Sequence, residues 1–351
     1  MSDKLNKCCV LGHFGLKHNL LNGQTVKTKI ITEELENQLG NEQVFKIDTY
    51  GGLKTLFKSP FQVFSALKNA KNTIILPAHN GLRVYAPLLS ILKKLFKNRK
   101  IHYVVIGGWL PEFIKDKKCL KEVLKDFDGI YVETNTMKKA LESQGFSNVV
   151  VMPNCKKLNV LIEEELVYPE GTPYKLCTFS RVSKEKGIGD AVRVVTEVNK
   201  KLGYTAFTLD IYGQVDQDQT EWFENLKSTF PDFVKYGGLV PFDKSTEVLK
   251  DYFALLFPTY YAGEGFAGTL IDAFSAGVPV IASDWRYNSE IVEHGKTGRI
   301  YSLDNKNGLE NILEYLIENK EKWNEMKKIC LEKANDYLPS KVVGDFIKYL
   351  N

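Results

Sequence analysis

Short apolar segments alternate with amphipathic helical segments along almost the whole chain, in two successive series. In residues 1–165 the segments expected to be strands are 8–11, 44–48, 73–77, 102–106, 129–132 and 149–152. The segments with helical character lie between them, at 24–39, 60–70, 82–97, 117–125 and 135–144. Strands that alternate with helices form parallel sheets, because a helical crossover brings each strand back in the same direction. The sequence therefore predicts an α/β fold with doubly wound parallel sheets.

A second series of the same kind begins at Cys177 and continues into a helical region at 308–337. Residues 153–173 separate the two series and contain three prolines and a glycine, which is typical of a linker. At 351 residues the chain is long enough for two cores. The expected parts are two Rossmann-like domains, 1–165 and 166–335, and a terminal amphipathic helix that returns to the first domain, 336–351.

A glycine-rich loop with two nearby acids lies in the second series. Glu264 stands in this loop, and Asp272 follows eight residues later in a segment expected to be helical from Thr269, which would place Asp272 in the first helical turn. Amides at a helix N-terminus bind phosphate well. A helical separation of about 12 Å between the acids exceeds the ~5 Å of a retaining hydrolase pair. We therefore expect two acceptors for the hydroxyls of one long ligand; alternatively, Asp272 is only a favourable helix-terminal charge and Glu264 a solvated residue.

This stretch resembles the donor-site signature of glycosyltransferase family 4, the retaining nucleotide-sugar transferases of GT-B architecture. The family pattern has two glutamates separated by seven residues, and here the second acid, Asp272, is shorter by one methylene. Residues 178–188 resemble a second family element, in which Arg181 and Lys186 are five residues apart. A guanidinium and an ammonium suit a diphosphate, although two cations in a lysine-rich chain can also be ordinary surface residues.

The resemblance implies a set of site residues in both domains. It implies catalytic roles for Glu264, Arg181 and Lys186. It implies donor binding by loop residues, namely Gly15, Gly23, Gly265, Phe266, Ala267, Gly268, Thr269, Leu270 and Asp272. The family often places a histidine near the sugar, and the matching stretch of this chain contains Trp109 but no histidine. The candidates for sugar or acceptor contact are therefore His13, His79 and Trp109, and each histidine has a structural role as its alternative.

The resemblance further implies two domains that face each other across a cleft and transfer a sugar with retention of configuration. The donor would be a nucleotide-diphosphate sugar, with UDP favoured, and the acceptor a glycan or lipid-linked molecule in surface polysaccharide biosynthesis. Cations and loop amides would stabilise the leaving diphosphate electrostatically, so a hexosyltransferase that needs no metal and no cofactor is expected. The six cysteines lack the paired spacing of zinc sites or disulfide frameworks, which fits a cytoplasmic protein.

Three alternatives remain open at this level. One is a GT-B epimerase or hydrolase of sugar nucleotides, and another is a binding protein without turnover. The third is an NAD-dependent dehydrogenase, because residues 12–15 (GHFG) follow the first strand and Asp48 ends the second. The third glycine of the dinucleotide motif is missing, and the helix begins only near Gly23, after a long loop.

The charge is spread unevenly along the chain. Residues 1–165 carry 25 Lys and Arg against 16 Asp and Glu, whereas residues 166–351 carry 22 against 27. Residues 51–100 contain ten basic residues and no acidic one, and large apolar residues stand among them. This pattern suits an anionic membrane surface, with a basic solvent-facing helix as the alternative. No apolar run is long enough to span a membrane, residues 1–12 resemble a strand more than a signal peptide, and no nucleic-acid motif accompanies the charge. We therefore expect a cytoplasmic protein, peripheral on the inner face of the cell membrane, that binds no nucleic acid.

Overall fold

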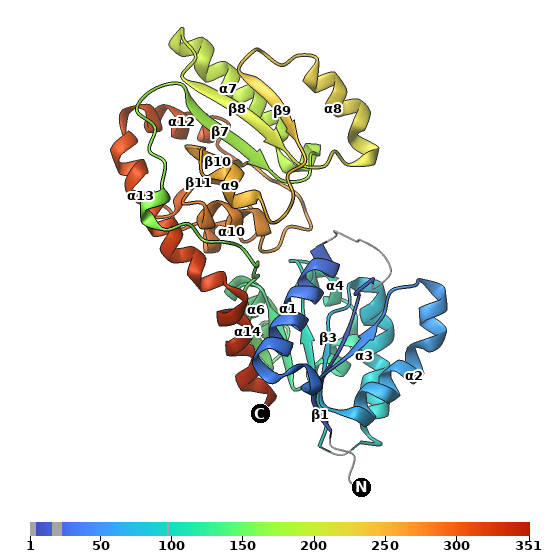
Figure 1. Cartoon of the computed structure of the whole chain (residues 1–351). Coiled ribbons are helices and arrows are strands. Elements are labelled where there is room, and N and C mark those ends of the chain that lie inside the picture. Colours follow the sequence, from blue (N-terminus) through green and yellow to red (C-terminus); the bar gives the residue numbers. More distant parts are fainter. Residues whose placement is uncertain (1–4, 16–22, 97) are drawn as a thin grey trace. The chain divides into compact units, whose positions relative to one another are not determined.

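The computed structural model describes residues 5–15, 23–96 and 98–351. The chain forms two compact units (Figure 1): Met1–Lys156 together with Leu338–Asn351, and Lys157–Tyr337. The boundary lies earlier than the expected division after residue 165. The reason is that the segment after it packs into the second unit, where Leu161 and Leu166 contact Leu331 and the Leu161 amide donates to the Ser275 carbonyl over 2.9 Å.

The first unit contains one parallel sheet. Its strands are β1 (Asn6–Gly12), β2 (Val44–Asp48), β3 (Ala70–Ile75), β4 (Lys100–Val104), β5 (Gly129–Val132) and β6 (Val149–Val151). Their order is β2-β1-β3-β4-β5-β6, and every neighbouring pair is parallel. The winding reverses between β1 and β3, so the loops that follow these two strands diverge to opposite faces of the sheet.

Six helices precede the linker in the described part of this unit. They are α1 (Gly23–Leu39), α2 (Leu53–Asn69), α3 (His79–Lys93), α4 (Leu110–Ile114), α5 (Lys118–Lys125) and α6 (Asn135–Glu142). The expected start of α2 at residue 60 was wrong, because Pro60 lies inside the helix and not at its first turn. The longer helix places Phe57 and Phe61 one turn apart on the same element.

The last segment of the chain completes the core of the first unit. Helix α14 (Pro339–Ile347) contributes Val343 and Phe346 to this core, where the Phe346 ring meets Tyr131 edge to face at 4.6 Å. A buried polar network holds the residues after α14 in place, because Asn72 Nδ2 donates to the Leu350 carbonyl over 2.9 Å. The His102 ring lies between Asn72 Oδ1 and the Tyr131 hydroxyl, at 3.0 Å from each.

The second unit, Lys157–Tyr337, also contains one parallel sheet. Its strands are β7 (Tyr174–Phe179), β8 (Phe207–Tyr212), β9 (Val234–Gly238), β10 (Ala254–Phe257), β11 (Val280–Ser283) and β12 (Gly298–Tyr301). They are ordered β12-β11-β10-β7-β8-β9, and all neighbours are parallel. Counted from the first strand of the unit, this is the 3-2-1-4-5-6 order of dinucleotide-binding sheets, with its reversal between β7 and β10.

The helices of the second unit cover this sheet. They are α7 (Ile188–Leu202), α8 (Thr220–Lys227), α9 (Ser245–Leu249), α10 (Gly268–Ser275), α11 (Asn288–Ile291), α12 (Gly308–Glu318) and α13 (Lys320–Ala334). The apolar stripe of α7 faces the core, with Ile188, Val195 and Val198 fully buried. The two doubly wound sheets confirm the predicted fold class.

Candidate active site

The residues predicted to bind the donor lie at the reversal point of the second sheet. Arg181 and Lys186 follow β7, and Glu264 follows β10, which is its neighbour in the sheet. In open parallel sheets, ligands bind beyond the carboxyl ends of the strands, where the loops of such a pair separate. The topology therefore gathers these three residues beyond the carboxyl ends of β7 and β10, two strands that Figure 1 shows as neighbours in the second unit.

The loop after β7 is held tightly against the segment after β10. It forms a short 3-10 turn, Lys184–Lys186, that ends at Gly187 in a left-handed conformation with φ of 72°. A Cβ on Gly187 would lie 2.2 Å from the Pro258 carbonyl oxygen, so only glycine fits there. The Tyr260 amide donates to the Glu185 carbonyl over 2.8 Å, which fixes the position of Lys186.

Lys186 and Glu264 form a buried ion pair. The distance from Lys186 Nζ to Glu264 Oε2 is 2.6 Å, and the side chains are 9% and 7% exposed. The Thr259 hydroxyl donates to the same carboxylate oxygen over 2.8 Å. The alternative interpretation of Glu264 as a solvated loop residue is therefore wrong, because the carboxylate is buried with two donors.

Arg181 lies at the outer side of this pair. Its Nη1 is 2.9 Å from Asp216 Oδ2, and the Arg181 side chain is half exposed. Its guanidinium lies 5.4 Å from the centre of the Tyr261 ring, and Lys186 Nζ lies 5.0 Å from the same ring. The Tyr261 ring therefore contacts both cations, an arrangement that favours positive charge beside the ring face. Tyr261, Thr259 and Asp216 were missed by the sequence analysis, although the first two stand within five residues of Glu264.

The N-terminus of α10 is adjacent to Glu264 in the chain. The helix begins at Gly268, and the residue before it, Ala267, has no side chain that caps the first amides. Among the described residues, the buried Thr269 hydroxyl has no hydrogen-bond partner. A helix start of this kind, close to a glycine such as Gly265, offers donors to an anion with several oxygens.

Asp272 is placed differently from expectation. It is the fifth residue of α10, so it lies beyond the first turn, and the helix has no acid in that turn. Its side chain is 2% exposed. The Ser245 hydroxyl, at the first residue of α9, donates to Asp272 Oδ1 over 2.7 Å. The shorter acid is thus joined to α9 in this structure, and Ser245 is a further partner that the sequence analysis missed.

Two residues predicted to bind the donor have their side chains in the core. Phe266 is 5% exposed and meets Tyr337 edge to face at 4.8 Å, and Leu270 is fully buried. With both side chains in the core, the predicted donor contact at these two positions would be made by backbone groups, and it stays a prediction.

In the first unit, the loop after β1 is organised by Asp48. Asp48 Oδ1 accepts hydrogen bonds from the amides of Phe14, Gly15 and Tyr50, at 3.0, 3.3 and 2.9 Å. The amide of Gly15 therefore already has a carboxylate partner. Asp48, at the end of β2, thus stabilises the loops that follow β1 and β2. This use of Asp48 gives no support to the dehydrogenase alternative, in which that acid would bind ribose.

Two further candidates of the first unit, His13 and Gly23, also follow β1. His13 Nδ1 is 2.8 Å from the Thr25 hydroxyl in α1, and the His13 ring meets Tyr50 edge to face. Gly23 is the first residue of α1, and nothing lies within 4 Å of where its Cβ would be.

His79 and Trp109 form an aromatic cluster with Phe113 in the first unit. The His79 and Trp109 rings are 3.8 Å apart, and Phe113 meets both edge to face. Arg83 and Lys117 lie over the Phe113 ring, at 5.0 and 4.3 Å from its centre. Partial burial and these two cations lower the pKa of His79 below its usual value. The structure thus brings together two of the three residues expected to contact sugar or acceptor.

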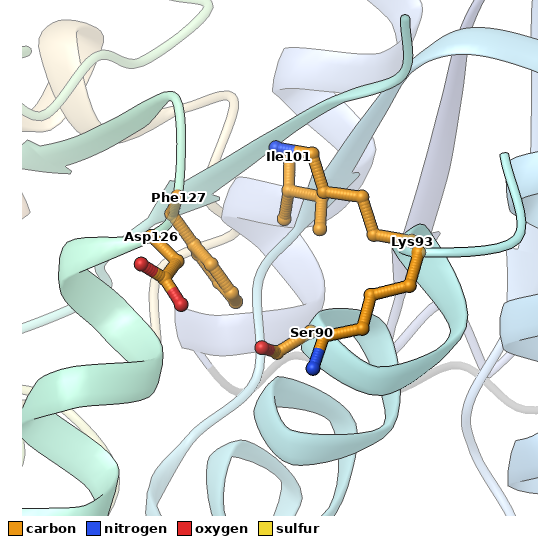
Figure 2. Close-up of a pocket in the computed structure, with 6 residues that line it drawn as sticks. Ser90, Lys93, Ile101, Asp126 and Phe127 are labelled. Carbon is orange, nitrogen blue, oxygen red and sulfur yellow. The ribbon is translucent and has the colours of Figure 1, made fainter. Parts of the chain in front are cut away.

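A pocket of about 330 Å³ opens elsewhere in the first unit (Figure 2). Its lining includes Ser90 and Lys93 of α3, Ile101 at the start of β4, and Asp126 and Phe127 before β5. These residues lie at the amino ends of the strands, opposite to the edge where parallel sheets bind ligands. The pocket is therefore separate from the candidate site.

Within residues 5–15, 23–96 and 98–351, no group of three or more His, Cys, Asp or Glu is arranged to hold a metal ion.

Residues 165–332 match the family model described as "Glycosyl transferases group 1". Among curated proteins, the chain is 26% identical over 232 residues to the GtfA subunit of a UDP-N-acetylglucosamine–peptide N-acetylglucosaminyltransferase from Streptococcus gordonii. That match covers 64% of this chain and 44% of GtfA. This chain is also 23% identical over 199 residues to the amylovoran biosynthesis glycosyltransferase AmsK of Erwinia amylovora. That match covers 53% of this chain and 48% of AmsK. The chain thus spans less than half the length of these two relatives.

Solved structures resemble the whole chain. HepE of Anabaena, in complex with UDP, superposes with a TM-score of 0.71 at 14% identity and covers 97% of this chain and 98% of its own. A glycosyltransferase from Rickettsia africae gives a TM-score of 0.70 at 14% identity and covers 98% of each chain. At this level of identity, the likeness concerns the fold. Residues 165–332 thus form a glycosyl transferases group 1 domain, and the two parallel six-stranded sheets of the chain have the GT-B fold.

Proposed function

We propose that this protein is a retaining glycosyltransferase of family 4 that moves a hexose from a UDP-sugar to a glycan or lipid-linked acceptor. The observation that carries the proposal is the cluster at the reversal point of the second sheet. There, Arg181, the buried pair of Lys186 and Glu264, and the N-terminus of α10 come from loops after adjacent strands. Two cations and uncapped amides are the groups that a diphosphate needs.

In this proposal the donor diphosphate replaces Glu264 as the partner of Lys186. The Lys186 ammonium lies 2.6 Å from Glu264, and phosphate oxygens entering the loop would offer it a second anion. Glu264 would then accept hydrogen bonds from the hydroxyls of the transferred sugar, while the Thr259 hydroxyl keeps its carboxylate oriented. Arg181 would exchange its contact with Asp216 for the phosphate.

Catalysis would rest on charge stabilisation. The sugar acquires positive character as the bond to the diphosphate breaks, and the leaving group gains negative charge. Arg181, Lys186 and the amides near Gly268 lie on adjacent loops, and once the two cations have exchanged their protein partners for the bound diphosphate, these groups stabilise the charge that develops in the reaction. Because these groups supply the positive charge, the proposed reaction uses no metal ion and no cofactor.

The choice of donor and pathway is supported by relatives alone. GtfA is named for UDP-N-acetylglucosamine, HepE was solved with UDP, and AmsK is named for amylovoran biosynthesis. From these relatives we infer that this protein uses a UDP-sugar donor and acts in surface polysaccharide biosynthesis. Asp272 is assigned to the ribose hydroxyls, which requires the carboxylate to share or exchange its hydrogen bond with Ser245.

The acceptor is assigned to the aromatic cluster of the first unit. The His79 and Trp109 rings, which lie 3.8 Å apart and are tilted by 31°, offer an apolar platform suited to a sugar ring, and the lowered pKa of His79 favours its neutral form at pH 7. We place the reaction in the cytoplasm, at the inner face of the cell membrane, where a lipid-linked acceptor is available.

The test is an incubation of the protein with UDP-glucose, UDP-N-acetylglucosamine and UDP-galactose, with and without extracted lipid-linked acceptors, followed by product analysis. A glycosylated acceptor with the anomeric configuration of the donor supports the proposal. An epimerised nucleotide sugar, or free sugar released equally with and without acceptor, would instead indicate the epimerase or hydrolase. Binding of UDP in thermal-shift assays without any product would indicate a binding protein.

A further inference from the structure

Five large apolar side chains are exposed on one part of the first unit. Phe57 and Phe61 of α2 are 81% and 78% exposed, and Phe64 of the same helix is 45% exposed. Ile91 of α3 and Leu95 just beyond it are 62% and 70% exposed. Single apolar residues on a surface need no explanation, but a contiguous group of large ones indicates an interaction site.

The five residues lie on or just after two helices that pack against each other, and we term them the α2–α3 face. On α2, positions 57, 61 and 64 follow the spacing of one helical stripe. The Phe64 ring meets Phe96, which follows α3, edge to face at 5.3 Å, so the two helices are joined at this surface. Figure 1 shows α2 and α3 as neighbours at the edge of the first unit.

The segment that carries the α2–α3 face is strongly basic. Residues 51–100, which include both helices, contain ten Lys and Arg and no Asp or Glu. Lys58, Lys68 and Lys94 are exposed on or beside α2 and α3. Lys93 is not grouped with these three exposed lysines, because its Nζ forms an ion pair with Asp128 over 2.8 Å.

We propose that the α2–α3 face docks on an anionic lipid membrane, with the phenylalanines inserted at the interface and the lysines on lipid headgroups. Aromatic and aliphatic side chains flanked by lysines match the apolar and anionic layers of a membrane surface. A second copy of this chain is a poor occupant. A symmetric dimer brings the same patch of two subunits together, which would place two positive surfaces against each other. No helix in the described ranges is long and apolar enough to cross a membrane.

This inference deepens the proposed location at the membrane and rests on that part of the proposed function. It does not depend on the donor site, because vesicle binding requires neither a nucleotide sugar nor turnover. A failure of membrane docking is therefore distinguishable from a failure of the transferase proposal, which is read from the reaction products.

The experiment is co-sedimentation of the full chain with vesicles. One set is pure phosphatidylcholine and the other contains phosphatidylglycerol as well. We expect binding to the second set only, and at least a tenfold loss of binding between about 0.1 M and about 1 M salt, because the Debye length falls from ~10 to ~3 Å.

Variants separate the apolar and electrostatic contributions. The double replacement of Phe57→Ala and Phe61→Ala should reduce binding at least tenfold, and Lys58→Glu with Lys94→Glu should do the same. The matched controls are Phe242→Ala in the second unit, where the side chain is 62% exposed, and Lys139→Glu on α6 of the first unit. Both controls should bind vesicles like the unmodified protein.

Circular dichroism identifies any variant that fails to fold, and the low- and high-salt comparison of the unmodified protein tests the proposal without any variant. Equal binding to both sets of vesicles, or binding to neither, would overturn the proposal. Loss of binding in the controls to the same extent as in the α2–α3 variants would also overturn it. A concentration-dependent increase in mass that Phe57→Ala with Phe61→Ala abolishes, without vesicle binding, would assign the face to a second copy.

Discussion

Lys186 Nζ and Glu264 Oε2 lie 2.6 Å apart in the second unit, with both side chains almost completely buried. A buried ion pair is costly to break from one side, because the remaining charge has lost its partner. The same two residues are the ones that the proposed reaction would separate, one toward phosphate and the other toward sugar. Stability and activity at this site are therefore coupled, and variants can show how.

Glu264→Gln should lower the melting temperature of the unliganded protein. Removal of one partner of a buried pair costs about 3–5 kcal/mol where the other charge stays buried. UDP would return an anion to Lys186, so the rise in melting temperature on addition of UDP should be larger in the variant than in the unmodified protein. Sugar transfer should fall by about 100-fold, or ~2.7 kcal/mol.

Differential scanning fluorimetry with a UDP titration, together with a turnover assay, measures both effects. The control is Glu221→Gln on the exposed surface of α8. Identical UDP-induced shifts in Glu264→Gln and the unmodified protein would contradict the exchange of partners at Lys186.

Arg181→Ala should reduce activity and leave stability almost unchanged. The pair that Arg181 forms with Asp216 is exposed, and such pairs contribute about 0–1 kcal/mol to folding. Loss of the guanidinium should lower kcat/KM by about 10- to 100-fold, which corresponds to roughly 1.4–2.7 kcal/mol of transition-state stabilisation. Asp216→Asn removes the competing acceptor and should leave KM for the donor unchanged or lower. Steady-state kinetics with near-normal turnover in Arg181→Ala would remove this residue from the site.

Asp272 variants test whether the shorter acid still reaches the nucleotide. Asp272→Asn should weaken UDP binding about tenfold, since an amide accepts the ribose hydroxyls less well than a carboxylate, a loss of ~1.4 kcal/mol. Ser245→Ala leaves the Asp272 carboxylate in place without its 2.7 Å donor and should weaken UDP binding less. Calorimetric titration with UDP distinguishes the two. Normal UDP affinity in Asp272→Asn, with lowered stability, would assign Asp272 to the α9–α10 contact alone.

The stability of the first unit should fall in mild acid because of His102. Burial lowers the pKa of His102 from about 6.5 to about 4, so the folded protein keeps the ring neutral while the unfolded chain takes up a proton first. The neutral ring contributes its full share of the unfolding free energy above pH 6.5, and this share is lost as the pH falls toward 4. The loss is about 2 kcal/mol at pH 5.

Urea unfolding at pH 7 and pH 5 measures this difference. His102→Gln lacks a group that titrates in this range and should show a smaller loss of stability between the two pH values. If the variant and the unmodified protein lose stability equally, the acid sensitivity has another source.

The sequence predicted the elements that depend on local patterns. The alternation of strand and helix segments predicted both sheets. The motifs in the loops after β7 and β10 predicted Arg181, Lys186 and Glu264 as site residues. The partners of these residues could not be predicted in the same way. Asp216 follows β8 and Ser245 begins α9, so their contacts with Arg181 and Asp272 depend on how distant loops pack.

The packing of individual side chains also could not be predicted from residue type alone. Phe266 occupies a loop position of the donor motif, but the large ring is more stable against Tyr337 in the core than in water. Pro60 was expected to begin a helix, where its missing N–H costs nothing. Instead α2 continues through Pro60, in a helix whose Ser59 and Val63 are buried, so tertiary packing outweighs the local penalty.

The return of Leu338–Asn351 to the first unit has a consequence for biosynthesis. The ribosome makes the first unit's sheet first but releases the helix that completes its core last, after the whole second unit has emerged. A nascent chain at that stage carries an unfinished surface around Tyr131, where Phe346 will pack. Completion of the first unit therefore waits until the second unit has been synthesised, so a truncation just before Leu338 would damage the part of the protein that was made first.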